Sequence, residues 1–145
     1  MRNFRFIFIG LLVVVGLALL LKNKNGGFEE GTIEIQDKEV SVFVVRTEKE
    51  RAQGLMNVED LGEQRGMLFA FEDSAVRAFW NKDTFISLGI IWIEDSLIIG
   101  TSSLPNVQSN GNFQVVSPGE VDRVLELSVS DELFLNSRIG DYIKF

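Results

Sequence analysis

The residue types best suited to binding chemistry gather in one short segment that follows an expected strand. Within five positions the segment carries an indole ring, an ammonium, a carboxylate and a hydroxyl group, on Trp80, Lys82, Asp83 and Thr84. A pocket for a small polar ligand needs an apolar or aromatic wall and a few convergent polar groups. The alternative is a core Trp80 followed by a polar turn, whose surface Lys–Asp pair contributes little energy. Both interpretations stay open, and the four residues are predicted ligand-binding positions.

A second candidate ligand site lies earlier in the chain, at Arg51 and Met56. Arg51 could bind an anion through two parallel N–H groups, while Met56 could line an apolar wall. In the structural alternative, Gly54 ends a short helix, and Leu55 and Met56 fill the core. The residues alone favour the structural role, and Arg51 and Met56 are kept as predicted binding positions near Trp80.

Catalysis is restricted because the chain contains neither histidine nor cysteine. Ser-His-Asp triads and thiol nucleophiles are therefore excluded, and the commonest zinc ligand is missing. A carboxylate-dependent hydrolase, for example one acting on glycans, would rely on Asp83 and Glu126 as an acid–base pair about 5–10 Å apart. We expect no cofactor and no metal, and we favour a binding domain over an enzyme.

The charge of the chain is unevenly distributed. Four of the 14 basic residues flank an N-terminal apolar run, and the rest of the chain carries the other 10 together with all 21 acidic residues. Such a strongly negative domain repels phosphate backbones, and no basic stripe offsets this charge. We therefore expect no nucleic-acid partner.

The segment from Ser96 to Gly119 has no charged residue across 24 positions. It is rich in serine, threonine, asparagine and glutamine, whose neutral groups could bind a glycan or a peptide backbone without a charge clash. The alternative is a mobile connection, the more common role of such composition. The composition alone does not separate the two.

The N-terminal run from Phe6 to Leu21 contains sixteen residues without a charge. As a helix it would measure about 24 Å, short of the ~30 Å hydrocarbon layer, but Arg5 and Lys22 could extend it by snorkelling. No small-residue cleavage site follows, so an uncleaved anchor is favoured over a cleaved signal peptide. The predicted organisation is an anchor at 1–22, a linker at 23–30 and a domain at 31–145. A slight excess of positive charge before the run predicts an extracytoplasmic domain, in the periplasm or at the cell surface.

Short strands separated by turn signals dominate the rest of the chain. The expected strands are 32–35, 40–44, 66–71, 76–80, 90–94, 97–100, 113–116, 123–129 and 141–145, with Asp95 and Ser96 as a tight loop in one hairpin. One short helix is expected to begin at Glu48, because Thr47 and Glu50 match a capping box, and to end before Gly54. Another is expected to span 131–135 with Ser130 as its cap. The predicted fold is mainly β (α+β), a compact small barrel or sandwich with one or two short helices, plus the N-terminal transmembrane helix.

Several motifs, taken in order, resemble domain-of-unknown-function family 192. They are Arg51–Met56, Arg65–Phe71, Phe79–Thr84, Ser117-Pro118, Val124–Leu127 and Gly140-Asp141. The resemblance implies a compact β-rich fold and frequent export in bacteria behind a signal or anchor, and it implies no established activity.

The chain also departs from the family pattern. Asn81 and Asp83 replace the family's Met and Asn, Gly89 stands where an acidic residue is usual, and the cysteines of many members are missing. If that acidic residue carries the family's function, this chain has lost it or Asp83 replaces it. The leading hypothesis is a membrane-tethered binding or accessory domain of the envelope for a small polar ligand or an envelope component. The hydrolase is one alternative, and a structural interaction module with an exposed apolar patch is another.

Overall fold

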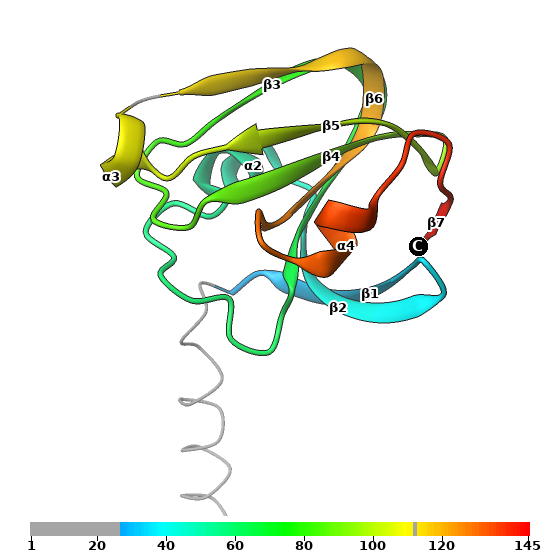
Figure 1. Cartoon of the computed structure of the whole chain (residues 1–145), viewed down its shortest axis with the longest axis horizontal. Helices are drawn as coiled ribbons and strands as arrows, with labels where there is room; N and C mark the ends of the chain where they lie inside the picture. Colours follow the sequence, from blue (N-terminus) through cyan, green and yellow to red (C-terminus); the bar gives the residue numbers. More distant parts are fainter. Residues whose placement is uncertain (1–26, 112) are drawn as a thin grey trace, which may run out of the picture.

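The computed structural model describes residues 27–111 and 113–145, which form a strongly curved half-barrel of strands with three short helices (Figure 1). This confirms the expected mainly β fold. The strands are β1 (Glu29–Ile35), β2 (Lys38–Val45), β3 (Gly66–Trp80), β4 (Leu88–Glu94), β5 (Leu97–Leu104), β6 (Gln114–Ser128) and β7 (Ile143–Lys144). The helices are α2 (Glu48–Gln53), α3 (Val107–Asn110) and α4 (Glu132–Asn136).

All strands belong to one sheet with the order β5-β4-β6-β3-β2-β1-β7. Every pairing is antiparallel except that of β2 with β3, which the crossover through α2 makes parallel. The C-terminal segment joins the two sheet edges: β7 pairs with β1, while Ile143 N donates to Ser96 O at 2.9 Å and Ile98 N donates to Asp141 O at 2.9 Å. The curved sheet is thus bridged at this end.

Two long strands differ from the sequence expectation. β3 and β6 each run through 15 residues, whereas two short strands were predicted in place of each. Their pairing shifts register between Ala70 and Ala75 and between Val76 and Ala78. Such bulges bend a strand without ending it, which explains why polar residues looked like a strand end. Beyond the first bulge, residues 75–80 of β3 pair with residues 114–121 of β6. This two-stranded segment, called the folded ribbon below, bends back over the sheet (Figure 1).

The sheet buries apolar side chains on both faces. Along β6, Leu125 and Leu127 belong to the cluster on one face, while Val124 belongs to the cluster on the other. The first cluster fills the half-barrel and includes residues of β1, β2, β4 and α4; the second lies under α2 and the folded ribbon. Because successive strand residues point to opposite faces, Glu126 shares the face of the second cluster.

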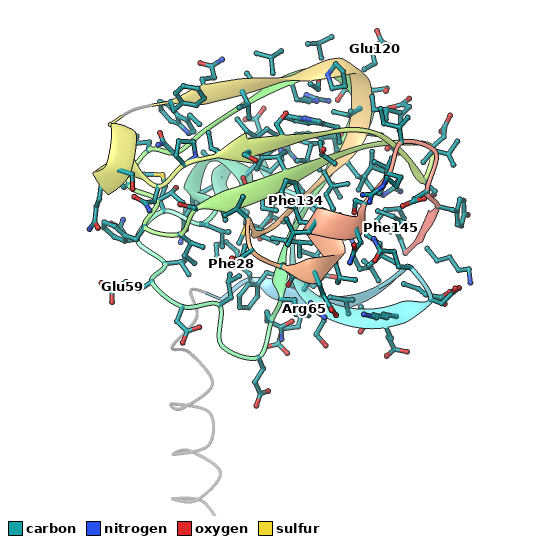
Figure 2. All side chains as sticks on the ribbon, in the orientation of Figure 1. Phe28, Glu59, Arg65, Glu120, Phe134 and Phe145 are labelled. Atoms are coloured by element: carbon teal, nitrogen blue, oxygen red, sulfur yellow. The ribbon has the colours of Figure 1, made fainter. Side chains whose placement is uncertain are left out.

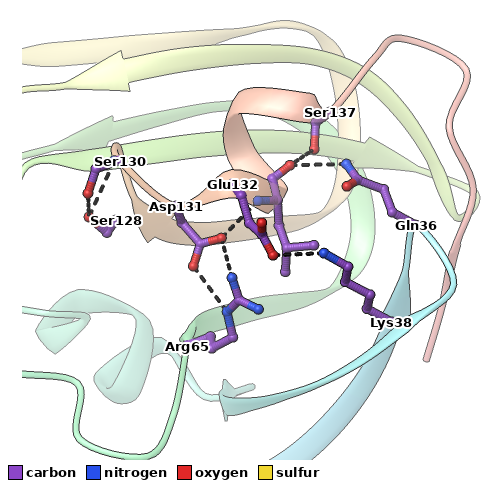
Figure 3. Close-up of polar contacts among 9 residues, drawn as sticks. Gln36, Lys38, Arg65, Ser128, Ser130, Asp131, Glu132 and Ser137 are labelled. Carbon is purple, nitrogen blue, oxygen red and sulfur yellow. Dashed lines mark hydrogen bonds and ion pairs between the residues drawn. The ribbon is translucent and has the colours of Figure 1, made fainter.

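Helix α4 is held against the sheet by an ion pair. Arg65 Nη2 donates to Asp131 Oδ1 at 2.6 Å and Arg65 Nε to Asp131 Oδ2 at 3.1 Å (Figure 3). Asp131 also accepts from Leu133 N at 2.8 Å, so Asp131, and not Ser130 as predicted, is the helix cap. The carboxylate of Asp131 can serve the guanidinium and the helix terminus together, which the Ser130 hydroxyl cannot do.

Helix α2 begins and ends where the sequence predicted. Thr47 and Glu50 form a capping box, and Gly54 adopts a positive φ of 47° after the last turn. Hydrogen bonds from the backbone of Thr47 and Arg46 lower the pKa of Glu50, so its carboxylate stays charged in this cap. The cap fixes the start of the helix and thereby the position of Arg51.

The N-terminal predictions fall mostly outside the described residues. The expected anchor at 1–22 is not described, and no helix within 27–111 and 113–145 is long and apolar enough to cross a membrane. β1 already includes Glu29 and Glu30, so the predicted linker at 23–30 extends two residues too far. The neutral segment 96–119 is largely ordered as β5, α3 and the start of β6 instead of one long loop.

Candidate functional site

A cavity of about 270 Å³ lies between the central strands, the folded ribbon and α2. Its wall includes both candidate segments of the sequence, because the ribbon brings Trp80 back toward the helix that carries Arg51. The lining residues are Arg51–Met56, Phe69, Phe71, Arg77–Trp80, Thr84 and Glu126. The predicted positions Arg51, Met56, Trp80 and Thr84 therefore come together.

Glu126 is the one carboxyl group in this wall. It lies on β6 opposite Met67 of β3 and Ile90 of β4, two fully buried apolar residues, and is itself only 4% exposed. No group among residues 27–111 and 113–145 hydrogen-bonds or pairs with its carboxyl group. Burial alone raises the pKa of Glu126 to about 8, so at neutral pH the group is a neutral carboxylic acid with an O–H to donate.

Two arginines and one aromatic ring form the wall on the α2 side. The guanidinium carbons of Arg51 and Arg77 lie 4.9 Å and 4.0 Å from the centroid of the Phe71 ring. Both distances are within the range of cation–π attraction. Arg51 Nη1 donates to the carbonyls of Ala70, at 3.2 Å, and Arg46. The ring contacts both guanidinium groups, and the two carbonyls hold Arg51 in place.

Arg77 has one carboxylate partner, which lies outside the cavity wall. Its Nη2 donates to Asp73 Oδ1 at 2.7 Å and to Asp73 O at 2.9 Å. The hydrogen bond and charge of Arg77, with a smaller effect of Arg51, lower the pKa of Asp73. The Nε of Arg77 is buried and has no acceptor among the described residues.

The segment around Trp80 divides between the cavity and the solvent. Trp80 lines the cavity while remaining 58% exposed, and Thr84 lines it while 4% exposed. Lys82 lies 5.4 Å from the Trp80 ring centroid, outside the lining, and Asp83 has a positive φ of 50° in an exposed turn. Lys82 and Asp83 are thus not brought to the cavity, and their predicted roles in binding stay predictions.

The proposed hydrolytic pair is not assembled in this cavity. Glu126 lines it, whereas Asp83 does not, and no other carboxylate is in the lining. Glycoside hydrolysis needs two carboxyl groups flanking one bond. Across the described part of the chain, no three acidic side chains are grouped so that they could hold a metal ion. The arrangement suits binding better than this acid–base chemistry.

Three structural features of this region were not singled out from the sequence. Phe71 was expected only as core, and Arg77 was not considered, although its position two residues before Phe79 puts both on one face of the strand. Asn81 is fully buried, and its side chain bonds the backbone of Pro105, Gly111 and Phe113 at 2.7–2.9 Å. The sequence signal for this buried hydrogen-bonding residue was a polar residue directly after a strand that ends in two aromatic residues.

Gly89, where the resemblance to the family predicts an acidic residue, is not in the lining of the cavity. A Cβ atom there would lie 2.3 Å from the ring of Phe134, which extends from α4 against the sheet (Figure 2). Its neighbours Leu88 and Ile90 belong to the cluster on the Glu126 face, so Gly89 points to the opposite face. Glu126 therefore lies on the other face of the sheet and does not take the place of that acidic residue.

Comparison with known proteins supports the fold. A model of the family DUF192, described as "Uncharacterized ACR", matches residues 31–145. A crystal structure of a protein of unknown function from Novosphingobium aromaticivorans is similar, with a TM-score of 0.73, 22% identity, and coverage of 84% of this chain and 89% of that one. A second, described as "a putative transcription regulator" from Sinorhizobium meliloti, has a TM-score of 0.69, 23% identity, and coverage of 81% and 94%. No curated protein matches significantly.

Proposed function

This chain belongs to the DUF192 family, and we propose that its domain is a binding protein for a small molecule held in the cavity between α2 and the folded ribbon. The ligand has an aromatic or apolar body and one hydrogen-bond acceptor that meets Glu126. The observation that carries the proposal is the buried Glu126 carboxyl group, which faces the cavity without a protein partner.

A carboxylic acid in an apolar wall is costly to bury unless its O–H finds an acceptor. No protein group supplies that acceptor to Glu126 among the described residues, and its carboxyl group opens onto the cavity, where a ligand would supply it. The cavity is slightly below the ~300–1,000 Å³ range of drug-sized sites, which fits a single-ring compound. Phe69, Phe79 and Trp80 supply aromatic walls for its body.

We further propose that the domain is tethered to a membrane on its extracytoplasmic side, where it would capture the ligand. The support is the apolar run at residues 6–21 with its flanking basic residues. Protease treatment of intact cells tests this placement. Digestion of the domain only after permeabilisation of the inner membrane would contradict it.

The binding proposal is tested by calorimetry on the full chain in detergent, with benzamide, phenylacetamide and 4-acetylbenzamide as probes. Each carries a ring and a carbonyl acceptor. Glu126→Leu is expected to weaken binding about 10-fold, whereas Glu126→Gln, which still donates, keeps most of it. Glu120→Gln is the matched control, because Glu120 is on the same strand and points to solvent (Figure 2). Absence of binding by all three probes, or equal binding by Glu126→Leu, would overturn the proposal.

A further inference from the structure

We infer that the ligand of this cavity is a monocarboxylate, whose carboxylate group is bound by Arg51 and Arg77 beside Phe71. The inference rests on the proposed function, because it names the chemical class of the molecule in the same cavity. It assigns the cavity two polar ends, an anion-binding end on the α2 side and the carboxyl group of Glu126.

The first support is a local excess of positive charge. The domain as a whole is strongly acidic, yet the cavity wall contains two guanidinium groups and a single carboxyl group, Glu126. Glu126 is buried among apolar residues, where the neutral form is favoured, so it does not balance the arginines. Outside the wall, Asp73 pairs with Arg77, and the charges of Asp73 and Glu50 act on Arg51.

The second support is the set of N–H donors that remain unused. Arg51 forms no ion pair within the described part of the chain, and its Nε and Nη2 donate to none of the described residues. Arg77 has Asp73 on Nη2, but its Nε is buried without an acceptor. The buried Nε–H of Arg77 is costly without an acceptor, and Arg51, which is half-buried, has N–H groups left to donate. An oxyanion between the two arginines would accept from both.

The third support is the rigid placement of both cations. Arg51 is fixed by the capped helix α2 and by two backbone carbonyls, and Arg77 by its own strand and Asp73. Both contact the Phe71 ring, which orients planar guanidinium groups and leaves their edges available. A preformed pair of this kind loses little side-chain entropy when it binds an anion.

The charge count favours a carboxylate over a phosphate. Asp73 and Glu50 already offset part of the positive charge of the two arginines, so a monoanion suits this end better than a phosphate dianion does. A carboxylate also presents two coplanar oxygens that match a guanidinium edge. The cavity is small enough that a single ring between the two polar ends would occupy most of it.

The test compares acids with their uncharged amides on the full chain in detergent, by calorimetry at pH 7. The pairs are benzoate with benzamide, phenylacetate with phenylacetamide, and 4-acetylbenzoate with 4-acetylbenzamide; phenyl phosphate is added as a dianion. At least one acid is expected to bind 10-fold or more tightly than its amide. Arg51→Gln and Arg77→Gln should abolish that preference for the acid, and circular dichroism with thermal unfolding shows separately whether the variants are folded.

Arg138→Gln is the matched control, because Arg138 is exposed and lies outside the cavity wall. It should keep the full preference for the acid. Equal binding of acid and amide by the unaltered chain would overturn the inference and leave the proposed function standing. Tighter binding of phenyl phosphate than of every carboxylate would also overturn it. Failure of both acids and amides to bind would reject the proposed function itself.

Discussion

The ring of Phe79 meets the indole of Trp92 edge to face, with the ring centroids 5.6 Å apart and the planes at 80°. Phe79 also contacts Phe69 in the same manner, at 4.8 Å and 83°. Phe69 and Phe79 are both on β3, on either side of its bulges, so these contacts pack the folded ribbon against the sheet. The cavity wall formed by the folded ribbon therefore depends on one aromatic cluster.

Replacing Phe79 by alanine should loosen the ribbon and open the cavity. Loss of the two aromatic contacts and of partly buried area is expected to lower the free energy of unfolding by about 2–3 kcal/mol. Urea unfolding followed by tryptophan fluorescence measures this, since Trp92 is fully buried. Val76→Ala is the control: Val76 is on the same ribbon but 60% exposed, so its change should stay within about 0.5 kcal/mol. Equal effects of the two variants would show that the ribbon is not held by Phe79.

Glu126 should make stability fall as pH rises through neutrality. In the unfolded chain its pKa is near the ordinary 4.5, and in the folded state it is about 8. Below pH 4.5 both states are protonated and there is no penalty. Between pH 4.5 and 8 the unfolded state alone releases the proton, so stability falls by about 1.4 kcal/mol per pH unit and then levels off above pH 8.

Glu126→Gln cannot ionise and should remove this dependence. The difference in unfolding free energy between the variant and the unaltered chain is therefore expected to grow from pH 5 to pH 8, reaching several kcal/mol. Urea unfolding at four pH values measures the difference, and Glu120→Gln serves as an exposed control on the same strand. If the unfolding free energies of Glu126→Gln and of the unaltered chain changed with pH in the same way, burial would not raise the pKa of Glu126.

Asn81→Asp should be strongly destabilising. The Asn81 amide donates to the carbonyls of Pro105 and Gly111, and a carboxylate in the same place can donate to neither. We expect a loss of about 3 kcal/mol or more, because a buried charge would face two carbonyl oxygens. Thermal unfolding measures it. Lys82→Ala, at the next and exposed position, should leave stability almost unchanged. A comparable loss of stability in Lys82→Ala would show that the buried hydrogen bonds of Asn81 are not the cause.

Gly89→Asp should fail to fold stably unless the ring of Phe134 is removed. A side chain at Gly89 would overlap that ring, since even a Cβ atom would lie 2.3 Å from it. Phe134→Ala alone should destabilise through loss of packing, and the double variant should be more stable than the sum of the single effects predicts. A double-mutant cycle by urea unfolding measures the coupling. Additive effects would show that Phe134 does not occupy the space required by an acidic residue.

Local structure was predictable because it depends on neighbouring residues. The capping box of Thr47 and Glu50 placed α2, and the turn at Asp95 and Ser96 placed the β4–β5 hairpin; both residues of that turn have the positive φ typical of two-residue hairpin loops. The cap of α4 was assigned one residue too early, because Ser130 and Asp131 are both good caps in sequence. Only the contact with Arg65 distinguishes them.

The candidate site was predictable in part. Arg51, Met56, Trp80 and Thr84 were identified by residue type, and all four line one cavity. Lys82 and Asp83 were included because they are adjacent in sequence, yet neither is in the lining of the cavity. Adjacent residues in an extended turn point in different directions, so neighbourhood in sequence does not imply a shared site.

By itself, the sequence determined most of the secondary structure, although not α3 or the full length of β3 and β6, together with the family and the available chemical groups. The chain has no histidine or cysteine, is rich in acidic residues, and carries basic and aromatic residues in recognisable motifs. The tertiary structure decided which of those groups meet. The bulges in β3 and β6 fold the ribbon back, and this fold brings Arg77 and Phe79 over α2 and Glu126. Bulges depend on long-range strand pairing, and the burial of Glu126 depends on layers contributed by distant segments. Neither of these non-local properties is encoded in a short stretch of sequence.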